Sequence, residues 1–91
     1  MSDTITYTLQ YPFQFTASRW IDQLVFQTEP KVRDLKRLDH ASGGIEAGIV
    51  LLSVLSGEPV DLIEALKASD YVGASKLVGP TVAGFLGAGA H

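Results

Sequence analysis

The stretch GGIEAGIVLLSVLSG, residues 43–57, contains a single charged residue, Glu46. Glycines at both ends and Pro59 just beyond favour a helix over residues 44–56, because glycine commonly ends helices and proline does not continue one. Apolar side chains occupy nearly all sides of this helix, and such a helix is buried on most sides. We therefore expect it to be the central helix of the fold. It is shorter than the roughly 20 apolar residues that span a bilayer.

The segment before it alternates like a half-buried strand. In TITYTLQYPFQF, residues 4–15, apolar side chains alternate with three threonines and a glutamine as far as Pro12. Pro12 cannot donate a backbone hydrogen bond, so it marks an edge or a bulge. A polar gap, TASR at residues 16–19, precedes a returning strand, WIDQLVFQ at residues 20–27. The pattern predicts an antiparallel hairpin, which must pack on other elements because two strands alone are barely stable.

One helix is expected before the central helix in the sequence and one directly after it. The first covers residues 28–41, with Thr28 as its N-cap, and ends at Gly43. The second is short, begins at Pro59 and turns apolar residues inward. Its inward residues are Leu62, Ile63 and Leu66.

A last helix is predicted over residues 70–86, with Ser69 or Asp70 as its cap. Pro80 removes one helical hydrogen bond, so a kink or a break is expected there, and the segment beyond it is either docked or mobile. The predicted fold class is α+β: an N-terminal antiparallel β-hairpin followed by a small bundle of three to four helices. The chain is expected to be a single domain, residues 1–91, made of the hairpin (1–28), a helical part (29–86) and a flexible tail (87–91).

The composition predicts an apolar surface that seeks a partner. The chain has 91 residues, of which 46% are hydrophobic and 19% are charged. A chain of this size buries only about 60–65% of its unfolded surface, so its core is thin. Surplus apolar surface is then expected to bind another chain, including a copy of this one. The net charge of −3 argues against binding nucleic acid, which needs a positive surface.

No catalytic, metal-binding or cofactor-binding pattern is found, so we expect a protein that is not an enzyme and needs no cofactor. His40 and His91 do not have the spacing of metal ligands. The carboxylates Asp61, Glu64 and Asp70 are expected to cap helices or to be solvated. Cysteine is absent, and the first residues lack the basic and apolar regions of a signal peptide, so the cytoplasm is the expected compartment.

One basic strip has two interpretations. At about 100° per residue, Arg33, Lys36 and Arg37 fall on one side of the first predicted helix. They could bind an acidic partner. Alternatively, they form a solvated helix face interleaved with Asp34 and Asp39.

The order of these segments resembles the small tail assembly chaperones of contractile-tailed, Mu-like bacteriophages. The resemblance covers nearly the whole chain, and its most specific pieces are PKVRDLKRLD at residues 30–39 and VAGFLG at residues 82–87. It implies a non-enzymatic protein in the host cytoplasm that binds the tape measure protein and keeps it soluble during tail assembly. Such a protein is not expected in the mature virion.

The resemblance also implies a second partner. Besides the tape measure protein, this is a longer form of the chain made by ribosomal frameshifting. From the residues themselves we expect a homo-oligomer, because apolar surface is in surplus, and no binding of nucleic acid or of a membrane. The codons of Gly84, Phe85 and Leu86 can contain the slippery run of thymines that frameshifting needs. The contact residues expected first are Val82, Phe85 and Leu86, followed by Tyr11, Phe13 and Trp20.

Two other functions remain open at the level of sequence. The chain could be a structural tail or virion component whose apolar surface is a permanent subunit interface. It could also be a small nucleic-acid-binding regulator that uses the basic strip, although its acidic balance speaks against this.

Overall fold

The chain folds as a β-hairpin followed by helices. The computed structural model describes residues 4–40 and 43–85, with side chains for 4–38 and 43–80. The α+β fold class predicted from the sequence is confirmed. The elements are β1 (Thr4–Thr16), β2 (Arg19–Gln27), α1 (Val32–Leu35), the 3₁₀ helix η1 (Lys36–His40), α2 (Gly44–Ser56), α3 (Val60–Glu64) and α4 (Ala68–Phe85).

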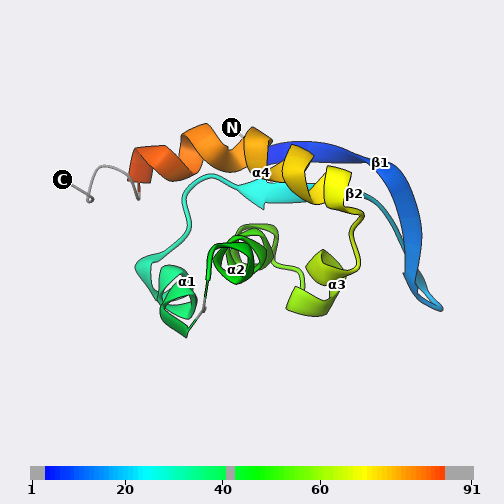
Figure 1. Ribbon diagram of the computed structural model, residues 1–91, viewed down its shortest axis with the longest axis horizontal. Helices are drawn as coiled ribbons and strands as arrows, with labels where there is room; N and C mark the ends of the chain where they lie inside the picture. The colour runs from blue at the N-terminus through cyan, green and yellow to red at the C-terminus, as the bar shows by residue number, and fades with distance from the viewer. Residues whose placement is uncertain (1–3, 41–42, 86–91) are drawn as a thin grey trace.

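The elements form two groups (Figure 1). The hairpin and α4 lie along one side, while α1, α2 and α3 lie on the other. Helix α4 packs on β1 and α2 packs on β2, so the core lies between the hairpin and these two helices. The largest fully buried side chains of this core are Leu24, Phe26, Leu52, Leu55, Leu62 and Ile63.

The hairpin contains a large bulge. Pairing runs from Thr4 opposite Gln27 to Thr8 opposite Gln23, and it resumes at Phe13 opposite Ile21. Residues 9–12 of β1 therefore face a single residue of β2. The bulge includes Pro12, as the sequence predicted, and it leaves backbone N–H groups of β1 without partners in the ladder.

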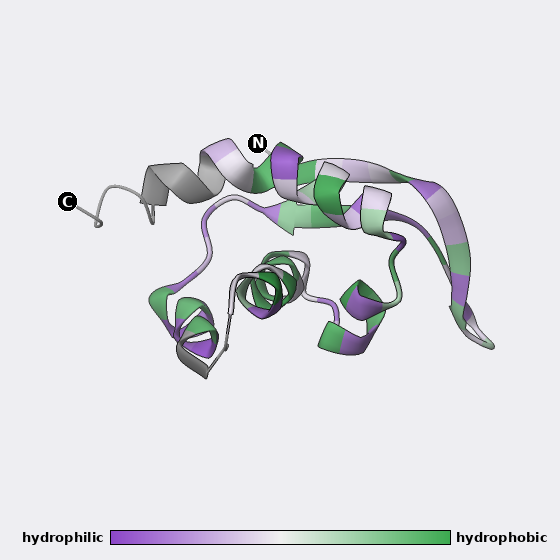
Figure 2. Ribbon diagram, viewed as in Figure 1, coloured by the Kyte–Doolittle hydropathy of each residue, from purple (hydrophilic) through white to green (hydrophobic). Residues whose placement is uncertain are grey.

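Helix α2 has the predicted limits but is buried over only half its length. It ends at Gly57, whose φ of 73° is the left-handed conformation that glycine adopts readily. Its second half is buried, whereas Ile45 in the first turn is 69% exposed. Hydrophobic residues nevertheless continue along both halves (Figure 2). The prediction that this helix is buried on most sides is therefore wrong for its first half, which is exposed at residues 44–46 and only half-buried at residues 47–50 because open cavities lie beside it.

The other helices differ from the prediction at their ends. The first begins at Val32 rather than after Thr28, because the Asp34 carboxylate accepts a hydrogen bond from the Lys31 backbone N–H at 3.2 Å and so starts the helix there. Helix α4 is not broken at Pro80. This proline lies on the exposed side of α4, where water can bind the carbonyl that it leaves without a helical partner.

Candidate functional site

An apolar groove lies where α4 passes α2 and α3. It consists of two adjoining cavities of about 380 and 260 Å³ that share Tyr71. The larger cavity lies between α2 and α4, and the smaller one lies between α2, α3 and the start of α4. The residues that line them are Gly48, Leu51, Leu52, Ser75, Val78 and Gly79 in the first, and Ile45, Ile49, Ile63, Glu64, Leu66 and Ala68 in the second.

Two glycines and a tyrosine shape the groove. Gly48 and Gly79 both line the larger cavity, and a Cβ atom at Gly79 would meet nothing within 4 Å. Tyr71 fits over Gly48, where a Cβ atom would overlap its hydroxyl group. That hydroxyl donates a hydrogen bond to the Ile45 carbonyl at 3.3 Å and so holds the ring at the junction of the two cavities.

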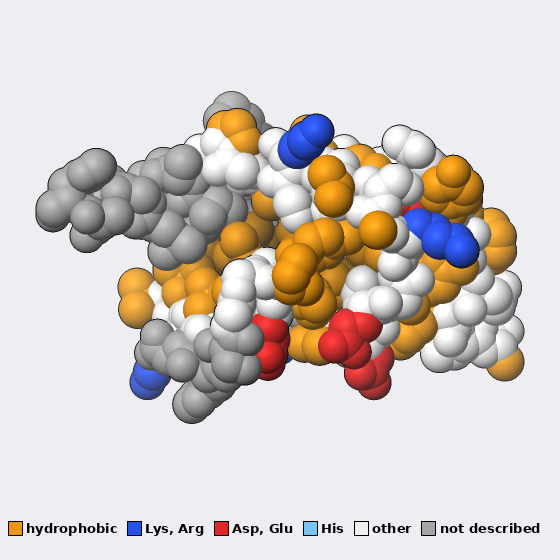
Figure 3. Space-filling view, viewed as in Figure 1, with side chains coloured by type: hydrophobic (Ala, Val, Ile, Leu, Met, Phe, Trp, Pro, Cys, Tyr) orange, Lys and Arg blue, Asp and Glu red, His pale blue; other side chains and the backbone are white. Residues whose placement is uncertain are grey.

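One rim of the groove is acidic. Glu64 lines the smaller cavity and is exposed. Two further carboxylates, Asp61 on α3 and Glu46 in the first turn of α2, are exposed but do not line either cavity. Figure 3 shows apolar side chains along the lower edge of α4, with acidic side chains gathered below them. A ligand in the groove would meet apolar surface at its centre and negative charge along this rim.

Asp70 fastens the α4 wall of the groove to the hairpin. Its side chain is fully buried and accepts backbone N–H hydrogen bonds from Gln10 at 2.8 Å and from Tyr11 at 3.0 Å. The Tyr7 hydroxyl donates a third bond at 2.9 Å. The two backbone donors belong to the bulge of β1, so Asp70 binds the N–H groups that the ladder leaves free. Its position in the first turn of α4 also places the negative charge at the favourable end of the helix dipole.

These contacts shift the pKa of both side chains. Burial by itself raises the pKa of Asp70, but the hydrogen bonds from Gln10, Tyr11 and Tyr7 outweigh it and hold the pKa below its ordinary value. Burial raises the pKa of Tyr7, and the hydrogen bond to Asp70 and its negative charge raise it further. Asp70 is therefore a buried carboxylate that stays ionised, which suits it to a structural role.

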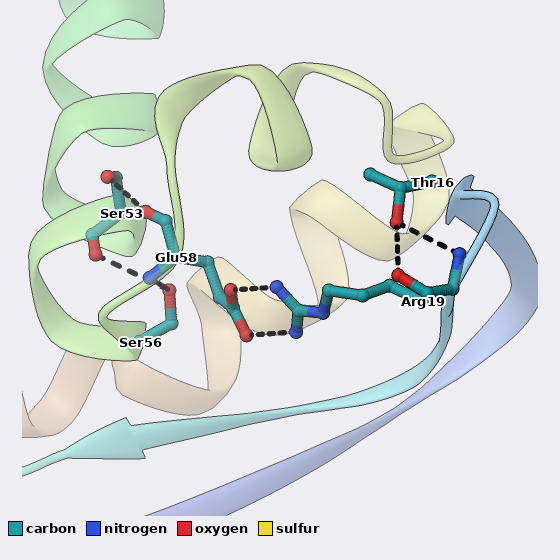
Figure 4. A network of polar contacts seen from close by, with 6 residues as sticks. Thr16, Arg19, Ser53, Ser56 and Glu58 are labelled. Carbon is teal, nitrogen blue, oxygen red and sulfur yellow. Dashed lines mark hydrogen bonds and ion pairs between the residues drawn. The ribbon is translucent and has the colours of Figure 1, made fainter.

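A second polar network holds the turn between α2 and α3 (Figure 4). The buried Ser53 hydroxyl donates to the Glu58 carbonyl, and the Ser56 hydroxyl accepts the Glu58 backbone N–H at 3.2 Å. The Glu58 carboxylate forms a two-bond ion pair with Arg19 at the tip of the hairpin, both bonds at 2.9 Å. The network connects the far end of the hairpin to the helices that form the groove.

The structure separates the predicted hairpin contact residues. Tyr11 and Trp20 are 53% and 58% exposed, so both are accessible to a partner. Phe13 is half-buried and packs against the core of its own chain. Phe13 therefore has a structural role that its position in the alternating pattern did not reveal.

The other predicted contact residues fall partly outside the described side chains. Val82 and Phe85 lie on α4, but their side chains are beyond the described ones. Leu86 lies outside the described residues.

The basic strip is divided between two kinds of helix. Arg33 lies on α1, while Lys36 and Arg37 lie on η1. The α-helical spacing that predicted a common face therefore does not continue beyond Leu35. Arg37 is also engaged, since its guanidinium donates to the Ser53 hydroxyl at 3.4 Å.

Sequence reasoning missed the two residues that organise the groove. Asp70 was expected to cap a helix or to be solvated, and it is fully buried. Tyr71, which joins the cavities, carried no expectation beyond an apolar position. One signal was present: Pro12 predicted an irregular strand, and an irregular strand needs acceptors for its free N–H groups.

The described part of the chain offers no metal site and no membrane span. Within residues 4–40 and 43–85, no three His, Cys, Asp or Glu side chains are grouped so that they could hold a metal ion. None of the helices in these ranges is long and apolar enough to cross a bilayer.

No family model, curated protein or solved structure matches this chain.

Proposed function

We propose that this chain is a phage tail assembly chaperone. In this proposal it binds apolar helical segments of the tape measure protein in the host cytoplasm and keeps them soluble until the tail tube forms around them. It acts without catalysis or a cofactor and leaves before the virion is complete. Further copies of the chain, and a longer frameshifted form, take part in the same assembly.

The observation that carries the proposal is the unfilled apolar groove between α2 and α4. The thin core of a small domain cannot bury all of its apolar surface, and here two cavities lie open beside the central helix. Open apolar surface of this kind is characteristic of binding sites. A chaperone needs such a surface, because its task is to cover apolar segments of another chain.

The resemblance in sequence supports the same function. Its two specific pieces adjoin, or belong to, the two helices that form the long walls of this groove. Residues 30–39 precede α2, and residues 82–85 of the second piece are the last four residues of α4. The groove is therefore formed by the helices that follow or contain the resembling segments.

Co-expression with the tape measure protein encoded beside this gene tests the proposal. We expect the tape measure protein to be soluble only when this chain is present and the two to co-elute, with light scattering giving the stoichiometry. A tape measure protein that aggregates regardless of this chain would contradict the proposal. Protein analysis of purified particles is the second test, because a chaperone is absent from them and a structural tail component is present.

A further inference from the structure

We infer that the groove between α2 and α4 accepts an amphipathic helix that carries basic residues along the flank facing α3. This inference rests on the proposed function, since it takes segments of the tape measure protein as the natural occupants. It adds the conformation, the length and the charge of the segment that fits.

The walls of the groove favour a helix over an extended segment. Both long walls are helices, α2 and α4, whose interior backbone groups are already paired within each helix. An extended occupant would bring its own N–H and C=O groups against Leu51, Leu52 and Val78, which offer no hydrogen bonds. A helix satisfies its backbone internally and presents only side chains.

The length of the groove fits about three helical turns. Its lining residues on α4 extend from Ala68 to Gly79, a distance of about 16 Å at 1.5 Å per residue. An occupant parallel to α4 would place apolar side chains at i, i+3, i+4 and i+7 into the two cavities. The missing side chain at Gly79, where a Cβ atom would meet nothing within 4 Å, leaves room for a large apolar residue at one end.

Charge gives the occupant an orientation. Glu64 on α3 lines the smaller cavity and is exposed, and acidic side chains gather on this side of the groove in Figure 3. On α4, the exposed Lys76 follows Ser75, which lines the groove. Lysine or arginine on the flank facing α3 would be attracted to this acidic rim, while carboxylates there would be repelled.

The described helices of the chain itself do not supply this occupant. Helices α1 and α3 have four and five residues, fewer than three turns need. Helix α2 of a second copy has no lysine or arginine, and α4 of a second copy has a single lysine, Lys76, so neither offers a basic flank. We therefore assign the groove to a helix of a different protein rather than to a second copy.

Two synthetic helical peptides of about four turns test the assignment. Both carry leucine and alanine at i, i+3, i+4 and i+7, and they differ only in having lysine or glutamate on one flank. Fluorescence anisotropy with the full chain measures each affinity. We expect the lysine peptide to bind about two- to tenfold more tightly than the glutamate peptide.

Matched variants locate the site. Ser75→Leu places a large side chain in the groove and should weaken binding of the lysine peptide by about tenfold or more. The control Ser69→Leu adds the same side chain at an exposed position outside the groove and should leave the affinity unchanged. Glu64→Lys should remove or reverse the preference between the two peptides, while Glu29→Lys makes the same charge change in the segment before α1 and should leave it intact. Circular dichroism checks that each variant is folded.

Equal affinities for the two peptides, or equal effects of Ser75→Leu and Ser69→Leu, would overturn the inference. It would also fail if light scattering showed that Ser75→Leu abolishes self-association, because the occupant would then be a second copy. If the Ser75→Leu variant keeps the tape measure protein soluble as well as the wild type does, the groove is not the binding site, but the chaperone function stands. If the peptides bind as expected while the tape measure protein still aggregates in the presence of this chain, only the chaperone function is refuted.

Discussion

At the scale of single residues, Asp70 has the largest expected effect on stability. Asp70→Asn keeps the size of the side chain but replaces one acceptor oxygen by an amide that donates. Either the Tyr11 N–H, or both the Gln10 N–H and the Tyr7 hydroxyl, would then face a donor, so we expect a loss of about 2–4 kcal/mol in the free energy of unfolding. Urea unfolding measures it, with the exposed Asp61→Asn as the control, which should change by less than about 0.5 kcal/mol.

The same carboxylate predicts how stability depends on pH. Its pKa in the folded chain lies below the ordinary value of 3.8, so the folded state holds the ionised form more strongly than the unfolded state does. Its contribution is therefore fully present above pH 3.8 and is lost as the pH falls from there through the lower folded pKa. Urea unfolding at a series of acidic pH values should show this loss in the wild type and a flatter profile in Asp70→Asn. Parallel profiles would mean that other carboxylates are responsible.

At the scale of elements, two helical glycines should respond in opposite ways to the same substitution. Gly73→Ala puts a Cβ against the Tyr7 hydroxyl, which is held by Asp70 and cannot move without breaking that bond. Gly48→Ala meets the tip of Tyr71, which borders open cavities and gives up only a longer bond, 3.3 Å to the Ile45 carbonyl, when it rotates away. Both changes gain about 1 kcal/mol of helix propensity.

We therefore expect Gly73→Ala to destabilise the protein by about 1–3 kcal/mol and Gly48→Ala to be neutral or stabilising. Thermal unfolding monitored by circular dichroism compares the two directly. If both variants were equally destabilised, Tyr71 would be as firmly held as Tyr7, and the groove would be a rigid feature.

The elements themselves were largely predictable, and their contacts were not. Alternation predicted the hairpin, and glycines at both ends predicted the limits of α2, because both signals are local in sequence. The groove depends on how α4 crosses α2. The hydrogen bonds of the Asp70 carboxylate join it to residues of β1 that lie about 60 positions earlier in the chain. Side chains such as Phe13 and Ile45 are both simply apolar in sequence, and only packing decides that the first contacts the core and the second is exposed.

At the scale of the whole molecule, the described residues include two separate apolar regions that a partner can reach. The groove is one of them. The hairpin carries the other, where Trp20, Tyr11 and Val25 are all more than 40% exposed. Because these regions are built from different elements, a copy of the chain bound at the hairpin would leave the groove available for a partner. Self-association and partner binding can therefore be separated by mutation.

The single tryptophan of the chain makes self-association through the hairpin measurable. Trp20 is 58% exposed in the isolated chain, so we expect its emission maximum to move to shorter wavelength as protein concentration rises and copies cover it. Light scattering should show a rising mass over the same concentrations. Val25→Thr removes apolar surface at a second exposed position of β2, so it should shift both transitions to higher concentration. A rising mass with unchanged emission would place the oligomer contact away from the hairpin. A constant monomer mass would contradict the predicted homo-oligomer itself.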